Sequence, residues 1–329
     1  HMFWNIRFRF GQVAAPQSIV LVTVEDDQTA GERTPDDMAR LLGILNSQAP
    51  KQIYYDQPLT VAPDSVLAQK VRSLGDKITI VDRVANLDNL SAGEMQLPNQ
   101  QVIGNAKIAY SGWYIDFLNY AQLAPYSLQI GQRKIPALSA DIAEHRSTED
   151  DYFIPNFSIN PNSILTIPDR QLIHGQIAPG LLTGRAVIVT NGVKGDQGQI
   201  GYYGHGRVNP VVLDVAGAAS IEAGKTINIG ELPIIAVFAF CMAIIGRLRR
   251  KVLRRVGYAS VSVMLVVGPV VLQMFGYYSL PTTAILAATF FGAHRLWTKW
   301  RNRVKQTSAS GLPNFVAMAE EKIGEGQDI

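Results

Sequence analysis

Acidic side chains follow three apolar segments of the chain at the points where predicted strands end. The four carboxylates concerned are Asp26, Asp27, Asp56 and Asp82. Ligands of an open parallel sheet bind outside the carboxyl ends of the strands, so these residues predict an acidic cleft for a cation or an amine. The same residue types are common as solvated loop residues and helix caps. We favour this second interpretation and keep the four acids as candidate ligand contacts.

A glycine-rich loop at residues 198–206 follows a later apolar segment and contains Tyr202 and His205. Its glycine spacing matches neither the dinucleotide-binding pattern G-x-G-x-x-G nor the Lys-Ser/Thr P-loop. Glycine patterns of this kind arise readily in surface loops. We therefore expect a surface loop in which Tyr202 and His205 are candidate contacts for a ligand.

Side chains suited to metal binding or nucleophilic catalysis are scarce. The single cysteine, Cys241, lies in an apolar stretch, and no G-x-S-x-G elbow is present. The histidines of the first two thirds of the chain lack i, i+4 spacing, and nothing favours a zinc site. We expect no metal, no cofactor and no catalytic residue in this chain.

The elements that must position the candidate residues alternate along the first two thirds of the chain. Strands are predicted at 18–24, 52–55, 77–81 and 185–190, and helices at about 35–45, 64–74, 138–145 and 211–223. This alternation favours a parallel sheet with crossover helices. Lys107–Trp113 is predicted as a shorter, antiparallel strand, so the fold class is α/β with a mixed, partly parallel sheet.

Charge divides the chain into two parts. Residues 1–232 hold 18 basic and 23 acidic side chains, whereas residues 233–329 hold 12 and 4. The second part also contains 38 consecutive residues without Asp, Glu, Lys or Arg, from Val256 to Ala293. As one helix this run would be about 57 Å long, against roughly 30 Å of bilayer hydrocarbon. It must therefore fold back, and Gly276–Pro281 is the predicted turn.

The resulting organisation is an outer α/β domain followed by a three-helix transmembrane segment. The domain is expected at 1–231 and the transmembrane helices at 232–248, 256–277 and 281–298. Residues 299–329 are expected to form a cytoplasmic linker and the start of a truncated output domain. The first apolar stretch, Leu232–Gly246, is short for a span, and a buried core helix or a re-entrant segment is the alternative.

Basic residues indicate the orientation. A cluster between the first two predicted spans comprises Arg247, Arg249, Arg250, Lys251, Arg254 and Arg255. A second basic cluster follows the third span, whereas the predicted turn carries no charge. The positive-inside rule places both clusters in the cytoplasm and residues 1–231 outside. Nucleic-acid binding is the alternative for such clusters, but basic runs beside apolar segments are better explained as membrane anchors, and we expect no nucleic-acid partner.

Several segments of the chain form a recognisable series, namely Asn5–Phe10, Ser18–Asp27, Thr34–Pro35 with Ala39–Leu42, Tyr54–Asp56, Arg185–Gly192 and Asn209–Ala216. In this order they resemble the CHASE-two family, which comprises extracytoplasmic sensor domains of bacterial cyclases and histidine kinases. Three membrane helices directly after the domain are also typical of that family. The chain departs from it in having Arg33-Thr34-Pro35 where the family has a Trp-Pro-Trp type of segment. After the last predicted span, Ser310–Phe315 is similar to the opening of the GGDEF diguanylate cyclase domain, although the GGDEF signature itself is absent.

The resemblance implies the sensor and transmembrane half of a bacterial signalling protein with a cyclic-di-GMP output. We expect no enzyme activity in this chain, a full-length parent that is a diguanylate cyclase or phosphodiesterase, and a multi-pass inner-membrane location with the sensor in the periplasm or outside. The expected partners are an extracytoplasmic ligand or envelope protein, membrane lipid, and a second copy bound through the transmembrane helices. Two alternatives remain: a membrane-anchored, metal-dependent hydrolase that uses Asp26, Asp27 and Asp56, and a scaffold that binds an envelope protein.

Overall fold

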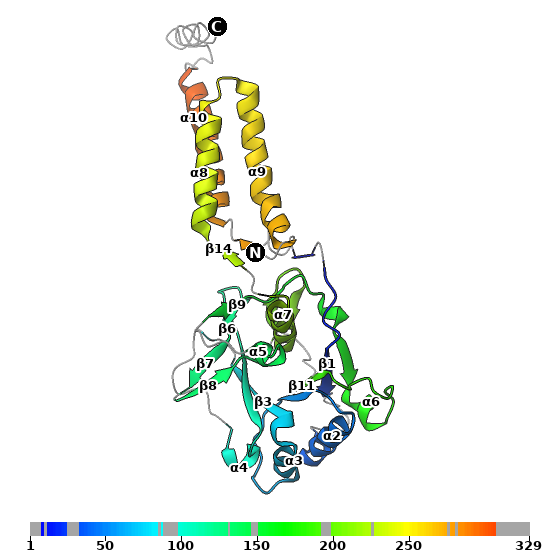
Figure 1. Ribbon diagram of the computed structural model, residues 1–329. Coiled ribbons are helices and arrows are strands. Elements are labelled where there is room, and N and C mark those ends of the chain that lie inside the picture. Colours follow the sequence, from blue (N-terminus) through cyan, green and yellow to red (C-terminus); the bar gives the residue numbers. More distant parts are fainter. Residues whose placement is uncertain are drawn as a thin grey trace. The chain divides into compact units, whose positions relative to one another are not determined.

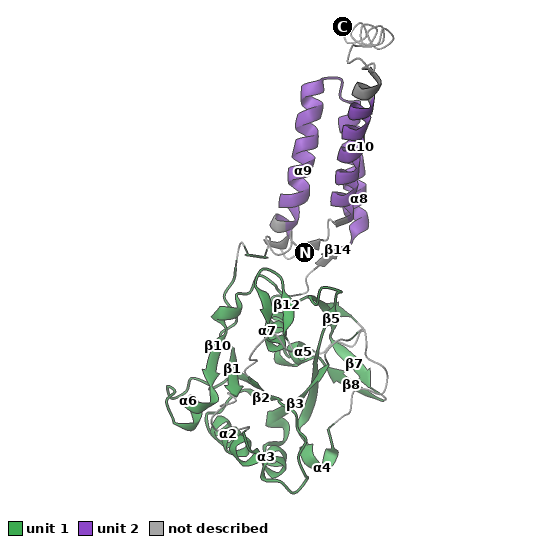
Figure 2. Cartoon of the chain, turned by 180° about the vertical axis from the view of Figure 1, so that it is seen from behind, with its two compact units in different colours: residues 1–226 green, residues 227–329 purple. Residues whose placement is uncertain are grey.

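The computed structural model describes residues 8–9, 12–24, 33–84, 87, 98–130, 132–145, 151–191, 199–224, 227–274, 277–279 and 282–306. The chain divides into two compact units, His1–Thr226 and Ile227–Ile329 (Figures 1 and 2). The division falls slightly before the boundary predicted at 231. Some features singled out in the sequence lie outside the described residues. They are the candidate ligand contacts Asp26 and Asp27, the start of the glycine-rich loop and the segment 310–315.

The first unit is built on a six-stranded sheet in which every strand pair is parallel. The sheet order is β10 (Leu165–Pro168), β1 (Ile19–Val24), β11 (Ala186–Asn191), β2 (Gln52–Asp56), β3 (Ile78–Val84) and β4 (Lys107–Gly112). The α/β class predicted from the sequence is confirmed. Its parallel sheet follows from buried, β-branched strands separated by helices.

Helices cover both faces of this sheet (Figure 1). One face carries α2 (Pro35–Ser47), α3 (Val66–Leu74), α4 (Gln100–Ile103) and α6 (Asp169–Ile173), and the other carries α5 (Leu138–Ile142) and α7 (Pro210–Glu222). Alternate residues of the strands are directed to the two faces. For example, Val187 and Val189 of β11 belong to the core under α2 and α3.

Local sequence explains where α2 begins and which face it buries. The Thr34 hydroxyl accepts a hydrogen bond from the Asp37 amide, and the Asp37 carboxylate accepts one from the Thr34 amide, which is a capping box. Pro35 occupies the first turn, as predicted. The predicted apolar stripe is confirmed because its members Met38, Leu41, Leu42 and Leu45 are buried.

The predicted antiparallel strand at Lys107–Trp113 is wrong in its direction. β4 is the edge strand of the main sheet and pairs in parallel with β3, with Ile80 opposite Ile108. The antiparallel pairs lie in smaller sheets instead. In one of them β6 (Ala121–Pro125) pairs with both β5 (Tyr114–Ile115) and β9 (Tyr152–Phe153). The other two are the pair of β7 (Ser127–Ile130) with β8 (Arg133–Pro136) and the pair of β12 (Ile200–Tyr202) with β13 (Gly206–Val208). Short 3-10 turns, η1 (Gly75–Lys77) and η3 (Pro161–Ser163), complete the unit.

The helices α5 and α7 approach each other closely at Gly217. A Cβ atom at this position would lie 2.5 Å from the Ser139 hydroxyl oxygen and 2.8 Å from the Phe153 ring. Only glycine fits such a contact without displacement of its neighbours. The α5–α7 layer is therefore tightly packed at this point.

The described part of the second unit contains three helices and one short strand pair. Its elements are β14 (Ile227–Ile229), α8 (Glu231–Arg247), α9 (Lys251–Met274), β15 (Tyr277–Ser279) and α10 (Thr282–Gln306). β14 and β15 pair in parallel, so the start of α8 and the connection after α9 lie at one end of the unit. Large apolar side chains are exposed on all three helices, for example Phe240, Met264 and Phe290 at 68%, 64% and 76%.

Three helices thus occupy the places where the sequence predicted three spans. Within the part of the chain that the structure describes, one stretch, Lys251–Pro269 with 19 residues, is long and apolar enough to cross a membrane by length and composition. α8 has 17 residues. α10 has 25 residues, but its second half is basic. Its apolar part is therefore limited to the first half, which begins at Thr282.

Candidate functional site

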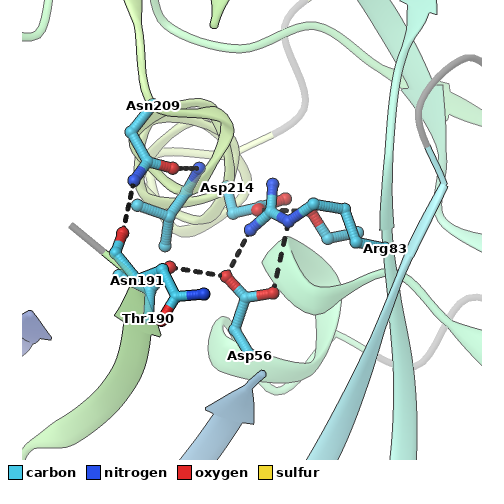
Figure 3. A network of polar contacts seen from close by, with 8 residues as sticks. Asp56, Arg83, Thr190, Asn191, Asn209 and Asp214 are labelled. Atoms are coloured by element: carbon cyan, nitrogen blue, oxygen red, sulfur yellow. Dashed lines mark hydrogen bonds and ion pairs between the residues drawn. The ribbon is translucent and has the colours of Figure 1, made fainter. Parts of the chain in front are cut away.

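A buried polar network lies at the carboxyl ends of the central strands, on the face covered by α7 (Figure 3). Asp56 ends β2, Arg83 lies near the end of β3, and Thr190 lies near the end of β11. Strand register brings them together, because Asp56 and Thr190 are direct neighbours across β2 and β11. Arg83 is in turn the direct neighbour of Ser111 on β4.

Asp56 is held by two partners. Its carboxylate accepts a hydrogen bond of 2.8 Å from the Thr190 hydroxyl and forms an ion pair with the guanidinium of Arg83. The Arg83 Nε also donates to Asp56 Oδ1 over 3.3 Å. The Asp56 side chain is only 4% exposed, whereas the Arg83 side chain is 31% exposed. The pair therefore places a buried anion beneath a cation that reaches solvent.

Asp214 of α7 completes the network from the opposite layer. The residue is 2% exposed, and its Oδ2 accepts a hydrogen bond of 2.6 Å from the Ser111 hydroxyl. Burial raises the pKa of Asp214 to about 7, although the charge of Arg83 and the Ser111 hydrogen bond act in the opposite direction. Two carboxylates thus share the field of one guanidinium. Burial lowers the pKa of Arg83, but Asp56 and Asp214 more than compensate and raise it overall.

The start of α7 is tied to the same edge of the sheet. The Asn209 side chain caps the helix by accepting a hydrogen bond of 3.1 Å from the Val211 amide, and it donates one of 3.1 Å to the Asn191 carbonyl at the end of β11. Pro210 then occupies the first helical turn. The first turns of α7 are therefore fixed to β11 by the cap and to β3 and β4 by Asp214 (Figure 3).

The network can change its charge through the protonation of Asp214. Asp214 can take up or release a proton near neutral pH, and such a change would alter the balance of charge around Arg83. Asp56 is already bound to Arg83, so it does not offer a free carboxylate to a cation. Among the described residues, no group of three or more His, Cys, Asp or Glu side chains is placed to hold a metal ion.

The structure separates most of the candidate residues that the sequence suggested. Asp82 and Arg83 are adjacent in β3, so the Asp82 side chain lies on the α2–α3 side of the sheet, away from Asp56. Burial raises the pKa of Asp82. An acidic cleft formed by Asp56 and Asp82 is therefore not present. Asp26 and Asp27 are outside the described residues, and their role stays a prediction.

Tyr202 and His205 belong to the β12–β13 hairpin and are not part of the network. The Tyr202 hydroxyl donates to the carbonyls of Asn156 and Ile159, each at 3.0 Å, and the residue is fully buried. Tyr202 is thus a core residue, contrary to its interpretation as a surface-loop ligand contact. His205 packs against the Tyr202 ring at 5.4 Å between centroids, and burial and the charge of Arg9 lower its pKa.

Sequence reasoning missed Arg83, Ser111, Thr190 and Asp214. One signal was available for Asp214, which is the only charged residue between Pro210 and Ile221 in an otherwise apolar helical segment. A lone carboxylate among apolar neighbours on a buried helix needs a partner. The identity of that partner depends on which strands lie under the helix, and the sequence pattern did not supply this.

The six basic residues used to predict membrane orientation lie around the connection from α8 to α9. Five of them, Arg247, Arg249, Arg250, Lys251 and Arg255, are exposed, and Arg254 is half-buried. Comparisons of the chain with protein-family models, with curated proteins and with solved structures found no match.

Proposed function

We propose that this chain is the sensor and membrane part of a bacterial signalling protein. In this proposal the α/β unit detects a ligand or partner outside the cytoplasm, and the three helices of the second unit carry the resulting change across the inner membrane. The observation that carries the proposal is the position of α7. It is anchored to the sheet by a buried charge network at one end and leads at its other end directly into the helical unit.

The membrane role is supported by the surface of the second unit. Soluble proteins rarely expose contiguous apolar surface of more than a few hundred Å², yet α8, α9 and α10 all expose large apolar side chains. The helical stretch Lys251–Pro269 is long and apolar enough to span a bilayer. Between Arg247 and Lys305 there are 11 basic residues and no acidic residue, which is the pattern of cytoplasmic membrane flanks.

The sensory role is supported by the connection between the sheet and α7. A signal needs an element with two arrangements that a ligand can bias. A helix held by a protonatable carboxylate, a guanidinium and a side-chain cap meets this requirement, because a change at any of these groups alters how α7 is held. Only residues 223–226 separate the end of α7 from the second unit.

The proposed output is cyclic-di-GMP turnover in a cytoplasmic domain that follows the helices. Its support is the similarity of Ser310–Phe315 to the opening of diguanylate cyclase domains, together with the CHASE-two resemblance of the first unit. The hydrolase alternative has no comparable support, since Asp56 is bound to Arg83.

Membrane topology is the first test. In a Cys241→Ser background, Ser73→Cys places a thiol on the exposed side of α3, and Asn302→Cys places one near the end of α10. A membrane-impermeant maleimide should label Ser73→Cys in intact cells and Asn302→Cys only after lysis. Gly201 is unsuitable for this purpose, because a Cβ there would lie 2.7 Å from the Tyr120 ring. Labelling of both positions only after lysis would refute the proposed orientation.

Coupling through α7 is the second test. The chain is fused to a diguanylate cyclase reporter, and cyclic-di-GMP is measured in cells that carry Asp214→Asn or the matched control Asp64→Asn on an exposed loop. We expect Asp214→Asn to change the output at least about twofold and the control to leave it unchanged. Unchanged output in a stably folded Asp214→Asn fusion would refute signal transfer through this network.

A further inference from the structure

A cavity lies at the edge of the main sheet opposite to the Asp56 network. It has a volume of about 690 Å³ and is lined by the first residues of the central strands, by α5 and by the β7–β8 hairpin. Gln52 begins β2, Lys107 begins β4 and Ala186 begins β11, so three strands open onto it. Its size is that of a small-molecule site.

The charged groups of the lining are not balanced. Lys51, Lys107 and Lys134 contribute three cations, and Asp141 and Glu144 contribute two anions. Glu144 is already paired with Lys51 at 3.0 Å between Nζ and Oε1. One positive charge therefore remains in excess.

Both acids of the lining have a bonding partner, Lys51 for Glu144 and Thr79 for Asp141. Asp141 accepts a hydrogen bond of 3.4 Å from the Thr79 hydroxyl. Burial raises the pKa of Asp141, and the positive charge of Lys107 and the hydrogen bonds from Tyr54 and Thr79 act in the opposite direction. Lys134 of β8 has no acidic partner among the described residues. The Ser127 hydroxyl, also in the lining, is buried without a hydrogen-bond partner in that same part of the chain.

An aromatic wall completes the cavity. The rings of Tyr126 and His145 are 4.6 Å apart between centroids and inclined by 35°, and both residues line the space. Among the described residues, the lining groups left without a partner thus include the Lys134 ammonium group and the Ser127 hydroxyl group, beside the Tyr126 and His145 rings. An occupant that matches them carries one negative charge, an additional polar group and a small carbon body.

We propose that this cavity binds a small organic monocarboxylate, with the Lys134 ammonium as its charge partner and the Tyr126–His145 wall against its carbon body. The binding site stands on the cavity alone, and its role as the sensor's ligand site rests on the proposed function. α5 supplies one wall through Ala140, Asp141 and Ile142. Because α5 packs against α7 at the tight Gly217 contact, an occupant that moves α5 would also act on α7.

Binding is measured by saturation-transfer difference NMR on the full chain in detergent micelles. The probes are sodium benzoate and sodium lactate and their neutral counterparts benzamide and lactamide, all at constant ionic strength. Inorganic phosphate, which has no carbon-bound proton to observe, is added as a competitor of the carboxylates. We expect at least one carboxylate to bind with a Kd of about 1 mM or lower and its amide to bind at least about tenfold more weakly. Failure of both carboxylates to give a saturable signal, or phosphate that displaces half of the better carboxylate at an equal concentration, would overturn the proposal.

Variants at Lys134 locate the binding. Lys134→Gln should weaken carboxylate binding at least about tenfold, Lys134→Arg should restore most of it, and Lys77→Gln, at an exposed lysine outside the cavity, should change nothing. Equal affinity of Lys134→Gln and the unsubstituted chain would show that the carboxylate binds elsewhere. The readout does not depend on membrane orientation or output, so its outcome is separate from that of the labelling and reporter experiments.

Discussion

Asp214 gives the sharpest prediction, because its protonation is linked to the stability of the α/β unit. Burial raises the pKa of this carboxyl group from its ordinary value of 3.8 to about 7. When the folded-state pKa lies above the unfolded value, the stabilising contribution is complete below the unfolded pKa and is lost as the pH rises through the folded pKa. The unit should therefore lose stability as the pH rises from about 4 to about 7.

The magnitude follows from the size of this shift. At about 1.4 kcal/mol for each pKa unit, the loss over the whole range is about 4 kcal/mol. About half of it, about 2 kcal/mol, falls between pH 5.5 and pH 8 because the unfolded carboxyl group is already mostly ionised at the lower value. Asp214→Asn removes this dependence, while its amide oxygen can still accept the Ser111 hydrogen bond. The free energy of unfolding of the variant, relative to that of the unsubstituted chain, should therefore rise by about 2 kcal/mol from pH 5.5 to pH 8.

Urea unfolding of the full chain in detergent micelles tests this value, with pulse proteolysis to follow the α/β unit. With an m-value of about 2 kcal/mol per M, the gain corresponds to a relative midpoint shift of about 1 M between the two pH values. Asp64→Asn, on an exposed loop, is the matched control and should show no such shift. A difference between Asp214→Asn and the unsubstituted chain that is equal at both pH values would contradict the reasoning. It would mean that Asp214 stays ionised beside Arg83.

Three further substitutions test the stability of the α/β unit through the same unfolding measurement. Arg83→Met leaves the buried Asp56 carboxylate without its cation and should cost about 2 to 3 kcal/mol, with Arg83→Lys recovering part of this loss; no loss would mean that the pair contributes nothing. Thr34→Ala removes the capping box and should cost about 1 kcal/mol, whereas Thr34→Ser should be nearly neutral. Gly217→Ala places a methyl group 2.5 Å from the Ser139 oxygen and should cost about 1 to 3 kcal/mol, and the double variant with Ser139→Ala should recover part of that cost.

The sequence predicted the elements of the main sheet where a local signal was strong. β1, β3 and β11 were predicted because runs rich in β-branched residues are typical of strands buried on both faces. β2 was predicted from the short Ile-Tyr-Tyr run that precedes Asp56. α2 was found because Thr34, Pro35 and two acids mark its start. β4 was assigned the wrong direction, since its short apolar run does not encode which neighbour it pairs with.

The candidate site was less predictable than the fold. Asp56 was singled out because it ends a strand, yet its partners come from residues 27 and 134 positions away in the sequence. Such pairings depend on sheet order, in which β11 lies between β1 and β2. The cavity at the amino ends of the strands was missed for a related reason, because lysines scattered from Lys51 to Lys134 share no local pattern.

The central position of β11 also affects how this unit is made. β1 and β2 are synthesised early, but the strand that joins them begins only at Ala186. Until it arrives, the facing edges of β1 and β2 have unpaired backbone groups that can bind other chains. Contacts so distant in sequence also slow folding. A nascent chain interrupted before residue 186 should therefore aggregate or depend on a chaperone, whereas one extended past Asn191 can complete its sheet.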